Sequence, residues 1–313
     1  MPTPASATPS SFHANAEPTI IDGCDKLVDF QAWSRTKIFP DRWLTNFEEK
    51  ERPFAVYLLS KFIFFSDALT DQLFISAYQG ISNFLPGEWQ SIDRQRAKWN
   101  HFLNSALITI VQGENPNPSD SGWLFARKAR KVLGVDQDNL CEPIFALNAA
   151  MQGFRGPIVF VDDFVGSGQQ FITSWHRKQP LQKGKPVSFA EAAANLPNVF
   201  IYCNAVATEY GISKIKAICP NVIISSGNVL PNKYSWVSVE SMLWPDSMRS
   251  AGLQFIRSAS MKAGMPDCNG GEGDWRGFHK LGLGLAFEHS VPDATLPLFT
   301  SEERGWQALV RIT

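Results

Sequence analysis

The stretch PIVFVDDFVGSGQQF, residues 157–171, contains four features in a fixed order. An apolar run ends in the carboxylates Asp162 and Asp163, and a Gly/Ser turn and a helix start follow them. Short apolar runs of this composition are typical of buried strands in parallel sheets. Because ligands of open α/β sheets bind at the carboxyl ends of such strands, this segment predicts both an α/β fold and the position of a site.

Each part of the turn has a chemical use. Backbone amides at the start of a helix hold a phosphate, and Gly166 and Gly168 let the backbone approach it without a Cβ clash. Ser167 adds a hydroxyl donor. Asp162 and Asp163, which we expect at a solvent-reachable strand end, suit ribose hydroxyls or a Mg²⁺ ion. The alternative is a plain connection in which both carboxylates only cap the turn.

The sequence around this segment predicts the rest of an α/β fold. After residue 103, short β-branched runs alternate with helical segments, which is the signature of βαβ units and a parallel sheet. Before it, residues 39–103 show helical periodicity, with one helix reaching about Phe64, and no strong strand signal. Strands are expected at 107–111, 158–161, 199–206, 222–225 and 283–287, and helices at 121–133, after Gly168, after the capping box Ser188–Glu191, and at 209–217.

Three segments are expected from composition and periodicity. Residues 1–25 form a flexible tail, since they begin with a run rich in Pro, Ser, Thr and Ala that has little apolar surface to bury. Residues 26–104 form an N-terminal helical module, and 105–313 the α/β domain. Within the last segment a helix is expected at 239–258, interrupted at Pro245. The glycine-rich stretch 262–277 is either a mobile lid over the site or an ordinary surface loop.

Composition excludes several classes of function. The chain has 313 residues and 29 basic against 30 acidic side chains, so its formal net charge of −1 does not indicate direct nucleic-acid binding. The local cluster Arg127, Lys128, Arg130 and Lys131 is expected to be a solvated face. No stretch approaches the roughly 18 apolar residues of a membrane helix, which predicts a cytoplasmic protein without a membrane partner. The five cysteines are scattered and form no zinc pattern.

The central segment resembles a known family. VDDFVGSGQQF, residues 161–171, resembles the phosphoribosyl-pyrophosphate motif of type I phosphoribosyltransferases, and it resembles more closely the phosphoribosyltransferase-like domains of bacterial conflict and anti-phage systems, including retron effectors. The resemblance implies a sheet of that type, with Asp162 and Asp163 as catalytic carboxylates on the ribose and as possible Mg²⁺ ligands. It assigns the 5-phosphate to Val165, Gly166, Ser167, Gly168, Gln169 and Gln170. Metabolic members usually have a threonine where this chain has Gln170.

Two flanking stretches support the same resemblance. Residues 119–123 resemble the pyrophosphate loop, which makes Ser121 and Gly122 candidates for that role. Residues 287–299 resemble a C-terminal signature of the defence proteins. Arg127 and His289 are further candidates for ligand contact, against the alternatives of a solvated cation and of a structural hydrogen bond.

The function implied by the resemblance is chemistry at a ribose. A phosphoribosyl-pyrophosphate or nucleotide ligand would undergo glycosyl transfer or N-glycosidic cleavage by a phosphoribosyltransferase-like glycosyltransferase, and the setting would be an antiviral effector or toxin. The alternative is a non-catalytic nucleotide sensor that uses the same pocket for binding and the helical module for a protein or nucleic-acid partner, with a protein partner or a defence complex as the expected assembly.

Overall fold

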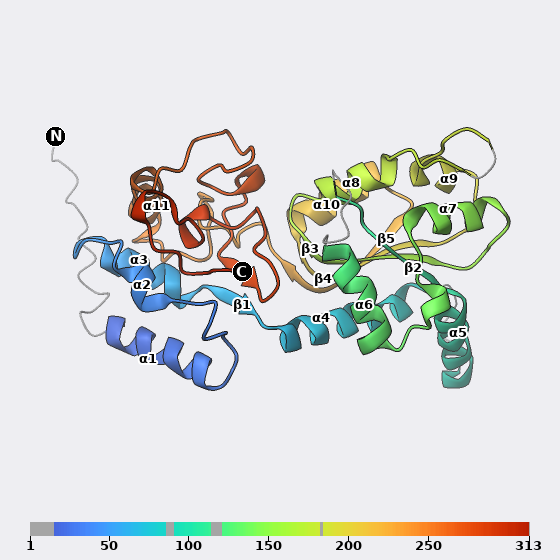
Figure 1. Cartoon of the computed structure of the whole chain (residues 1–313), viewed down its shortest axis with the longest axis horizontal. Coiled ribbons are helices and arrows are strands. Elements are labelled where there is room, and N and C mark those ends of the chain that lie inside the picture. Colours follow the sequence, from blue (N-terminus) through green and yellow to red (C-terminus); the bar gives the residue numbers. More distant parts are fainter. Residues whose placement is uncertain (1–15, 86–90, 114–120, 182–183, 313) are drawn as a thin grey trace. The chain divides into compact units, whose positions relative to one another are not determined.

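A computed structural model describes residues 16–85, 91–113, 121–181 and 184–312 (Figure 1). It combines α-helices with parallel strands, which confirms the α/β class. The chain forms two compact units. Unit 1 takes residues up to 68 and from 232 onward, and unit 2 takes residues 69–231.

Unit 2 contains a sheet of four parallel strands in the order β2-β3-β4-β5. Their bounds are Leu107–Ile110 (β2), Ile158–Val165 (β3), Phe200–Thr208 (β4) and Val222–Leu230 (β5). All nine residues of β4 are buried, as expected for an inner strand of a sheet covered on both faces. The register places Asp162 of β3 beside Asn204 of β4.

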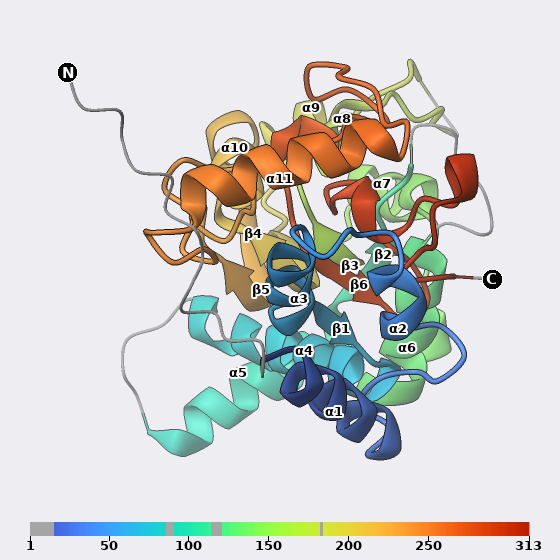
Figure 2. The ribbon, with the colours of Figure 1, turned by 90° about the vertical axis from the view of Figure 1, so that its left-hand side faces the viewer.

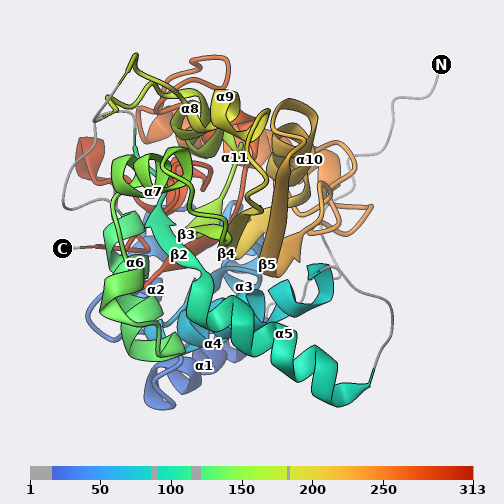
Figure 3. The same cartoon turned by 90° about the vertical axis from the view of Figure 1, so that its right-hand side faces the viewer.

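Helices cover both faces of this sheet (Figure 3). One face carries α7 (Pro143–Met151), α8 (Gln169–His176), α9 (Phe189–Ala193) and α10 (Glu209–Ile218), and their apolar side chains share a core with Phe160 and Tyr202. The other side carries α4 (Asp67–Gly80), α5 (Ile92–Ser105) and α6 (Ser121–Leu133). Ser225 of β5 donates a hydrogen bond of 2.6 Å to the carbonyl of Ala77, which ties α4 to the sheet.

Unit 1 is built around an aromatic core. Its strands β1 (Ile63–Phe65) and β6 (Leu285–Phe287) pair in parallel. Trp43, Trp236 and Phe299 are fully buried in one cluster. Helices α1 and α11 lie to either side of α2, α3 and β1 (Figure 2). The helices span Ala16–Asp29 (α1), Pro40–Leu44 (α2), Arg52–Ser60 (α3) and Arg249–Lys262 (α11), and short 3₁₀ helices occupy 278–280, 297–299 and 303–305.

The structure departs from the predicted elements at three places. Residues 63–65 form β1 rather than the end of a helix, because they pair with a strand more than 200 residues away. Helix α11 begins at Arg249 rather than near residue 239, since Pro245 lacks the N–H that a helix interior needs. Helix α1 starts at Ala16, so only residues 1–15 of the predicted tail lie outside the described residues.

The compact units also follow other boundaries than the predicted 26–104 and 105–313. The greater part of α4 and all of α5 belong to unit 2 with the sheet, while residues 232–312 belong to unit 1 with α1, α2 and α3. Local periodicity identifies helices but not the surface on which each helix packs. Within the described residues, no helix has the length and apolarity required to cross a membrane.

Candidate ribose-phosphate site at the end of strand β3

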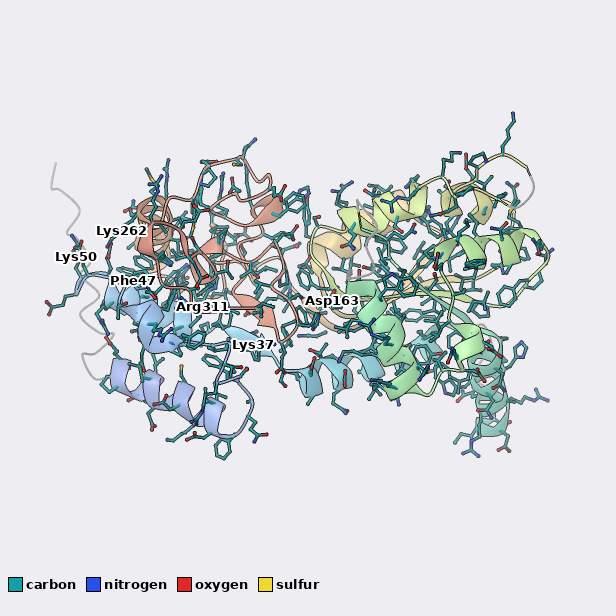
Figure 4. All side chains as sticks on the ribbon, viewed as in Figure 1. Lys37, Phe47, Lys50, Asp163, Lys262 and Arg311 are labelled. Atoms are coloured by element: carbon teal, nitrogen blue, oxygen red, sulfur yellow. The ribbon has the colours of Figure 1, made fainter. Side chains whose placement is uncertain are left out.

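Strand β3 carries the two predicted carboxylates in its second half, and Figure 4 labels Asp163 near the end of the strand. Both side chains are buried, with 1% of Asp162 and 7% of Asp163 exposed. The expectation of a solvent-reachable strand end is therefore wrong. The reason is that β2 and β4 flank β3 while helices cover both faces of the sheet.

The two carboxylates lie next to each other: the N–H of Asp163 donates a hydrogen bond of 3.0 Å to Oδ1 of Asp162, and the two side chains interact. Asp162 lies on the face of Tyr202, whose hydroxyl donates a hydrogen bond of 2.9 Å to its Oδ2. The ring of Tyr202 stacks on Phe171 of α8 at a centroid distance of 4.2 Å. The Oδ1 of Asp163 accepts from the backbone N–H of Phe164 at 2.8 Å.

Burial and charge change the titration of Asp162. Burial, and then the neighbouring charge of Asp163, raises its pKa well above the usual range, although the hydrogen bond from Tyr202 acts in the opposite direction. Burial and the charge of Asp162 likewise raise the pKa of the Tyr202 phenol. These shifts favour the neutral form of the Asp162 carboxyl, whereas an exposed carboxylate would be negatively charged at neutral pH.

A buried amide that the sequence analysis did not single out lies beside this pair. Asn204 is fully buried, and neither its Oδ1 nor its Nδ2 has a hydrogen-bond partner among the described residues. Its only sequence signal is a polar residue within the apolar run FIYCNAVAT of β4. Buried amides normally have hydrogen-bond partners, so we expect a water molecule or a ligand group to bind Asn204 near Asp162.

The turn after β3 has the conformation that its glycines predict. Gly168 has φ 75°, in the left-handed region, and is the N-cap residue of α8. A Cβ at this position would lie 2.8 Å from Cγ1 of Ile215 and 2.9 Å from the carbonyl oxygen of Gly211. Glycine is thus required both by the backbone conformation and by the approach of α10.

Helix α10 holds the turn in place from its N-terminus. Thr208 donates a hydrogen bond of 2.5 Å to the carbonyl of Gly166 and accepts one of 2.9 Å from the N–H of Gly211. A Cβ at Gly211 would lie 2.4 Å from the Gly166 oxygen. The turn is therefore pre-formed by the protein, as an anion-binding turn should be.

A lysine that the sequence analysis also missed contributes a positive charge to the turn. Nζ of Lys214 on α10 donates to Oε1 of Gln169 at 3.0 Å. The N–H of Gln169 in turn donates to the hydroxyl of Ser167 at 3.3 Å. Val165 and Ser167 are buried, whereas Gln170 is exposed. The six predicted phosphate-loop residues thus follow one another from the end of β3 through the turn into the start of α8, and Lys214 joins them from α10.

The remaining candidates belong to other segments of the chain. Residues 114–120 and the side chain of Ser121 fall outside what the structure describes. Gly122 is buried where α6 meets β2, since its Cβ would lie 3.0 Å from the Val111 oxygen. Arg127 lines a pocket on α6 and α7. His289 belongs to unit 1, with its ring 5.5 Å from that of Phe287, so its contact with a ribose ligand stays a prediction.

The residues present give limited support for a bound metal. The described part of the chain contains no group of three or more His, Cys, Asp and Glu side chains that is suited to a metal ion. A carboxyl whose neutral form is favoured, as in Asp162, is a poor ligand for a cation. Asp163 alone fits a Mg²⁺ ion that arrives on ligand phosphates, which is a common way for proteins to bind this ion.

Two comparisons with known proteins bear on the chain. A search among curated proteins finds no match. The family model PRTase-CE matches residues 40–311, a range that includes every strand, both carboxylates and the turn. The resemblance to phosphoribosyltransferase-like domains is thereby confirmed, and the chain belongs to the PRTase-CE family of such domains.

Proposed function

We propose that this protein binds a phosphoribosyl ligand, either phosphoribosyl pyrophosphate or a nucleotide, and transfers or cleaves the group on its ribose C1. The observation that carries this proposal is the left-handed Gly168, which is the N-cap of α8 and ends the turn that follows two carboxylates near the carboxyl end of β3. The 5-phosphate would bind the turn 165–169, with Lys214 adding a positive charge. The ribose hydroxyls would face Asp163.

The chemistry follows from the charges at this site. When the bond from C1 to the leaving oxygen or nitrogen breaks, the leaving group takes the electron pair and C1 becomes oxocarbenium-like. A carboxylate fixed nearby stabilises that positive charge without reorganising, and Asp163 would take this role. Asp162 would serve through a hydrogen bond rather than through a negative charge. A Mg²⁺ ion bound to a diphosphate leaving group would neutralise its developing charge.

The second candidate is a sensor that binds the same ligand and leaves it unchanged. One observation favours it. Since burial favours neutral Asp162 and Tyr202 already occupies its Oδ2, only one of the two carboxylates stays available as a charge for an oxocarbenium-like centre. In either case the biological setting that we propose is an effector of antiviral defence.

Mass spectrometry of the purified protein separates the candidates. The protein is incubated with phosphoribosyl pyrophosphate, NAD or a nucleotide mixture, alongside Asp163→Asn and the control Asp138→Asn, which changes an exposed aspartate. New ribosyl products from the wild type and the control, but not from Asp163→Asn, support the enzyme. Retention of intact ligand without product supports the sensor. If the protein neither retains the ligand nor forms a product, both candidates are contradicted. Phage protection by the same three proteins tests the defence role.

A further inference from the structure

A second pocket lies in unit 2 between α6 and the segment that leads into α7. Its volume is about 560 Å³, and its lining includes Trp123, Arg127, Arg130, Lys131, Cys141 and Phe145. None of the residues of the turn after β3 lines it. It is therefore a different site from the one proposed for the ribose, and the inference drawn from it is independent of that proposal.

Three positive charges gather on one side of this pocket. Arg127, Arg130 and Lys131 are three and four residues apart, so they share one face of α6. Lys128 points elsewhere and forms an ion pair with Asp71 of α4. Arg127, Arg130 and Lys131 are exposed, as expected for a solvated face, whereas Lys128 is half-buried and departs from that expectation.

Little negative charge faces these cations in the described part of the chain. The only acidic residue that lines the pocket is Glu142, and within the described ranges none of the three cations forms an ion pair. Arg130 donates a hydrogen bond of 2.9 Å to the side-chain oxygen of Gln137, which is uncharged. An anionic ligand would find an excess of positive charge here.

The rest of the lining is apolar and aromatic. Phe145 is 56% exposed, which is unusual for a phenylalanine on a helix of a packed domain, and Trp123 is half-buried on α6. Burial, and then the charge of Glu142, raises the pKa of the Cys141 thiol to about 11. This thiol therefore contributes an apolar surface to the pocket and is not a nucleophile. A planar ring is the kind of ligand that such walls accept.

We propose that this pocket binds a nucleotide unit, with its base against Phe145 and Trp123 and its phosphates on Arg127, Arg130 and Lys131. Guanidinium groups bind phosphate oxygens in pairs, and aromatic side chains stack on any base. The nucleotide unit belongs either to a free nucleotide or to the end of a single strand, because both present the same base and phosphate. An acidic peptide would use the cations but not the aromatic walls.

Hydrogen exchange of the full-length protein tests the proposal. The probes are ATP, a 5′-phosphorylated oligothymidylate, inorganic phosphate and polyglutamate. Protection of peptides covering 121–131 and 140–146 by ATP alone identifies a free nucleotide, and protection by the oligonucleotide identifies a strand end. Equal protection by phosphate or polyglutamate, or no protection by ATP or the oligonucleotide, overturns the proposal.

Matched variants show whether the named side chains hold the ligand. Arg127→Ala/Arg130→Ala should weaken binding of the protecting nucleotide about tenfold or more, whereas Arg94→Ala/Arg96→Ala, which removes two exposed arginines from α5, should leave it unchanged. Phe145→Ala should weaken binding about tenfold, and Phe145→Tyr should restore it. Equal affinities for the two arginine pairs, or for Phe145→Ala and the wild type, contradict the assignment.

Discussion

Adjacent aspartates at the end of β3 have different surroundings, and their substitutions should differ accordingly. Asp162→Asn should leave the fold intact, because an asparagine oxygen still accepts the hydrogen bond from Tyr202. It should also leave stability at pH 7 equal or higher, since ionisation of the buried Asp162 in the folded protein is unfavourable.

The pH dependence of this effect has a definite sign. The folded pKa of Asp162 is raised, so the wild type loses stability relative to Asp162→Asn as the pH rises above the unfolded value of about 4. Thermal unfolding of both proteins between pH 4 and pH 8 measures this. A variant that is less stable than the wild type, and more so at pH 8 than at pH 4, would show that Asp162 is ionised in the folded protein.

Lys214 is a second residue whose role depends on charge. Lys214→Gln should weaken binding of phosphoribosyl pyrophosphate about fivefold or more, because it removes a cation beside the turn that receives the phosphate. The matched control is Lys216→Gln, which removes an exposed charge two residues away on α10. Calorimetry with both variants gives the comparison. Equal affinities would mean that Lys214 only orients Gln169.

At the scale of elements, the turn after β3 and the start of α10 act as one packed unit. Gly168→Ala should lower the free energy of unfolding by about 1–3 kcal/mol, because it places a Cβ 2.8 Å from Ile215 in a backbone conformation that disfavours it. Gly184→Ala is the matched control, since Gly184 also has a positive φ, of 101°, but a Cβ added there would meet no atom of the described residues within 4 Å.

Chemical denaturation of these two glycine variants separates backbone strain from packing. A larger loss for Gly168→Ala than for Gly184→Ala measures the contact with α10. Equal losses of unfolding free energy in the two variants would mean that backbone strain accounts for the whole effect. Because this contact affects stability, weaker ligand binding by a Gly168 variant shows a phosphate cradle only if the variant is still folded under the conditions of the assay.

The same elements show what the sequence alone predicts. The apolar runs of β2 to β5 and the order of carboxylates, turn and helix locate the sheet and the candidate site, since these signals are local. The pairing of β1 with β6 is absent from the prediction because it joins distant segments. Tyr202, Asn204 and Lys214 were missed for a related reason. Their places at the site depend on the register of β4 against β3 and on the approach of α10 to the turn.

At the scale of the whole molecule, the chain enters unit 2 from unit 1 and returns to it, so unit 1 depends on segments from both ends of the sequence. Residues 262–277 of unit 1, predicted as a mobile lid or a surface loop, have an internal anchor. The fully buried Asp274 accepts hydrogen bonds of 2.9 Å from the N–H groups of Gly270 and Arg276 and from Nε of Arg276. We expect the amides of Gly270 and Arg276 to exchange slowly, equally with and without nucleotide. Rapid exchange that nucleotide slows would favour the lid.

Asp162 and Asp274 make opposite predictions for the two units in acid. Burial alone would raise the pKa of Asp274, but hydrogen bonds from Arg276 and from the Gly270 backbone hold it well below its usual range. A depressed folded pKa gives stability that is present above the unfolded value of about 4 and is lost as the pH falls below it. The pKa of Asp162 in unit 2 is raised instead, so acidification removes the unfavourable effect of ionising Asp162 on the stability of unit 2 rather than a stabilising interaction.

Unit 1 should therefore become the less protected unit as the pH falls from about 5 to 3. Hydrogen exchange, corrected for the intrinsic effect of pH, should show peptides covering 265–277 losing protection before those covering 158–165. Asp274→Asn should lower the stability of unit 1 at pH 7, because the asparagine amide forms no ion pair with Arg276. The same substitution should remove most of the acid sensitivity of unit 1. Asp246→Asn, at an exposed ion pair with Arg249, is the control and should change neither property. Loss of protection in 158–165 before 265–277 would mean that other carboxylates, rather than Asp274, determine the response of the molecule to acid.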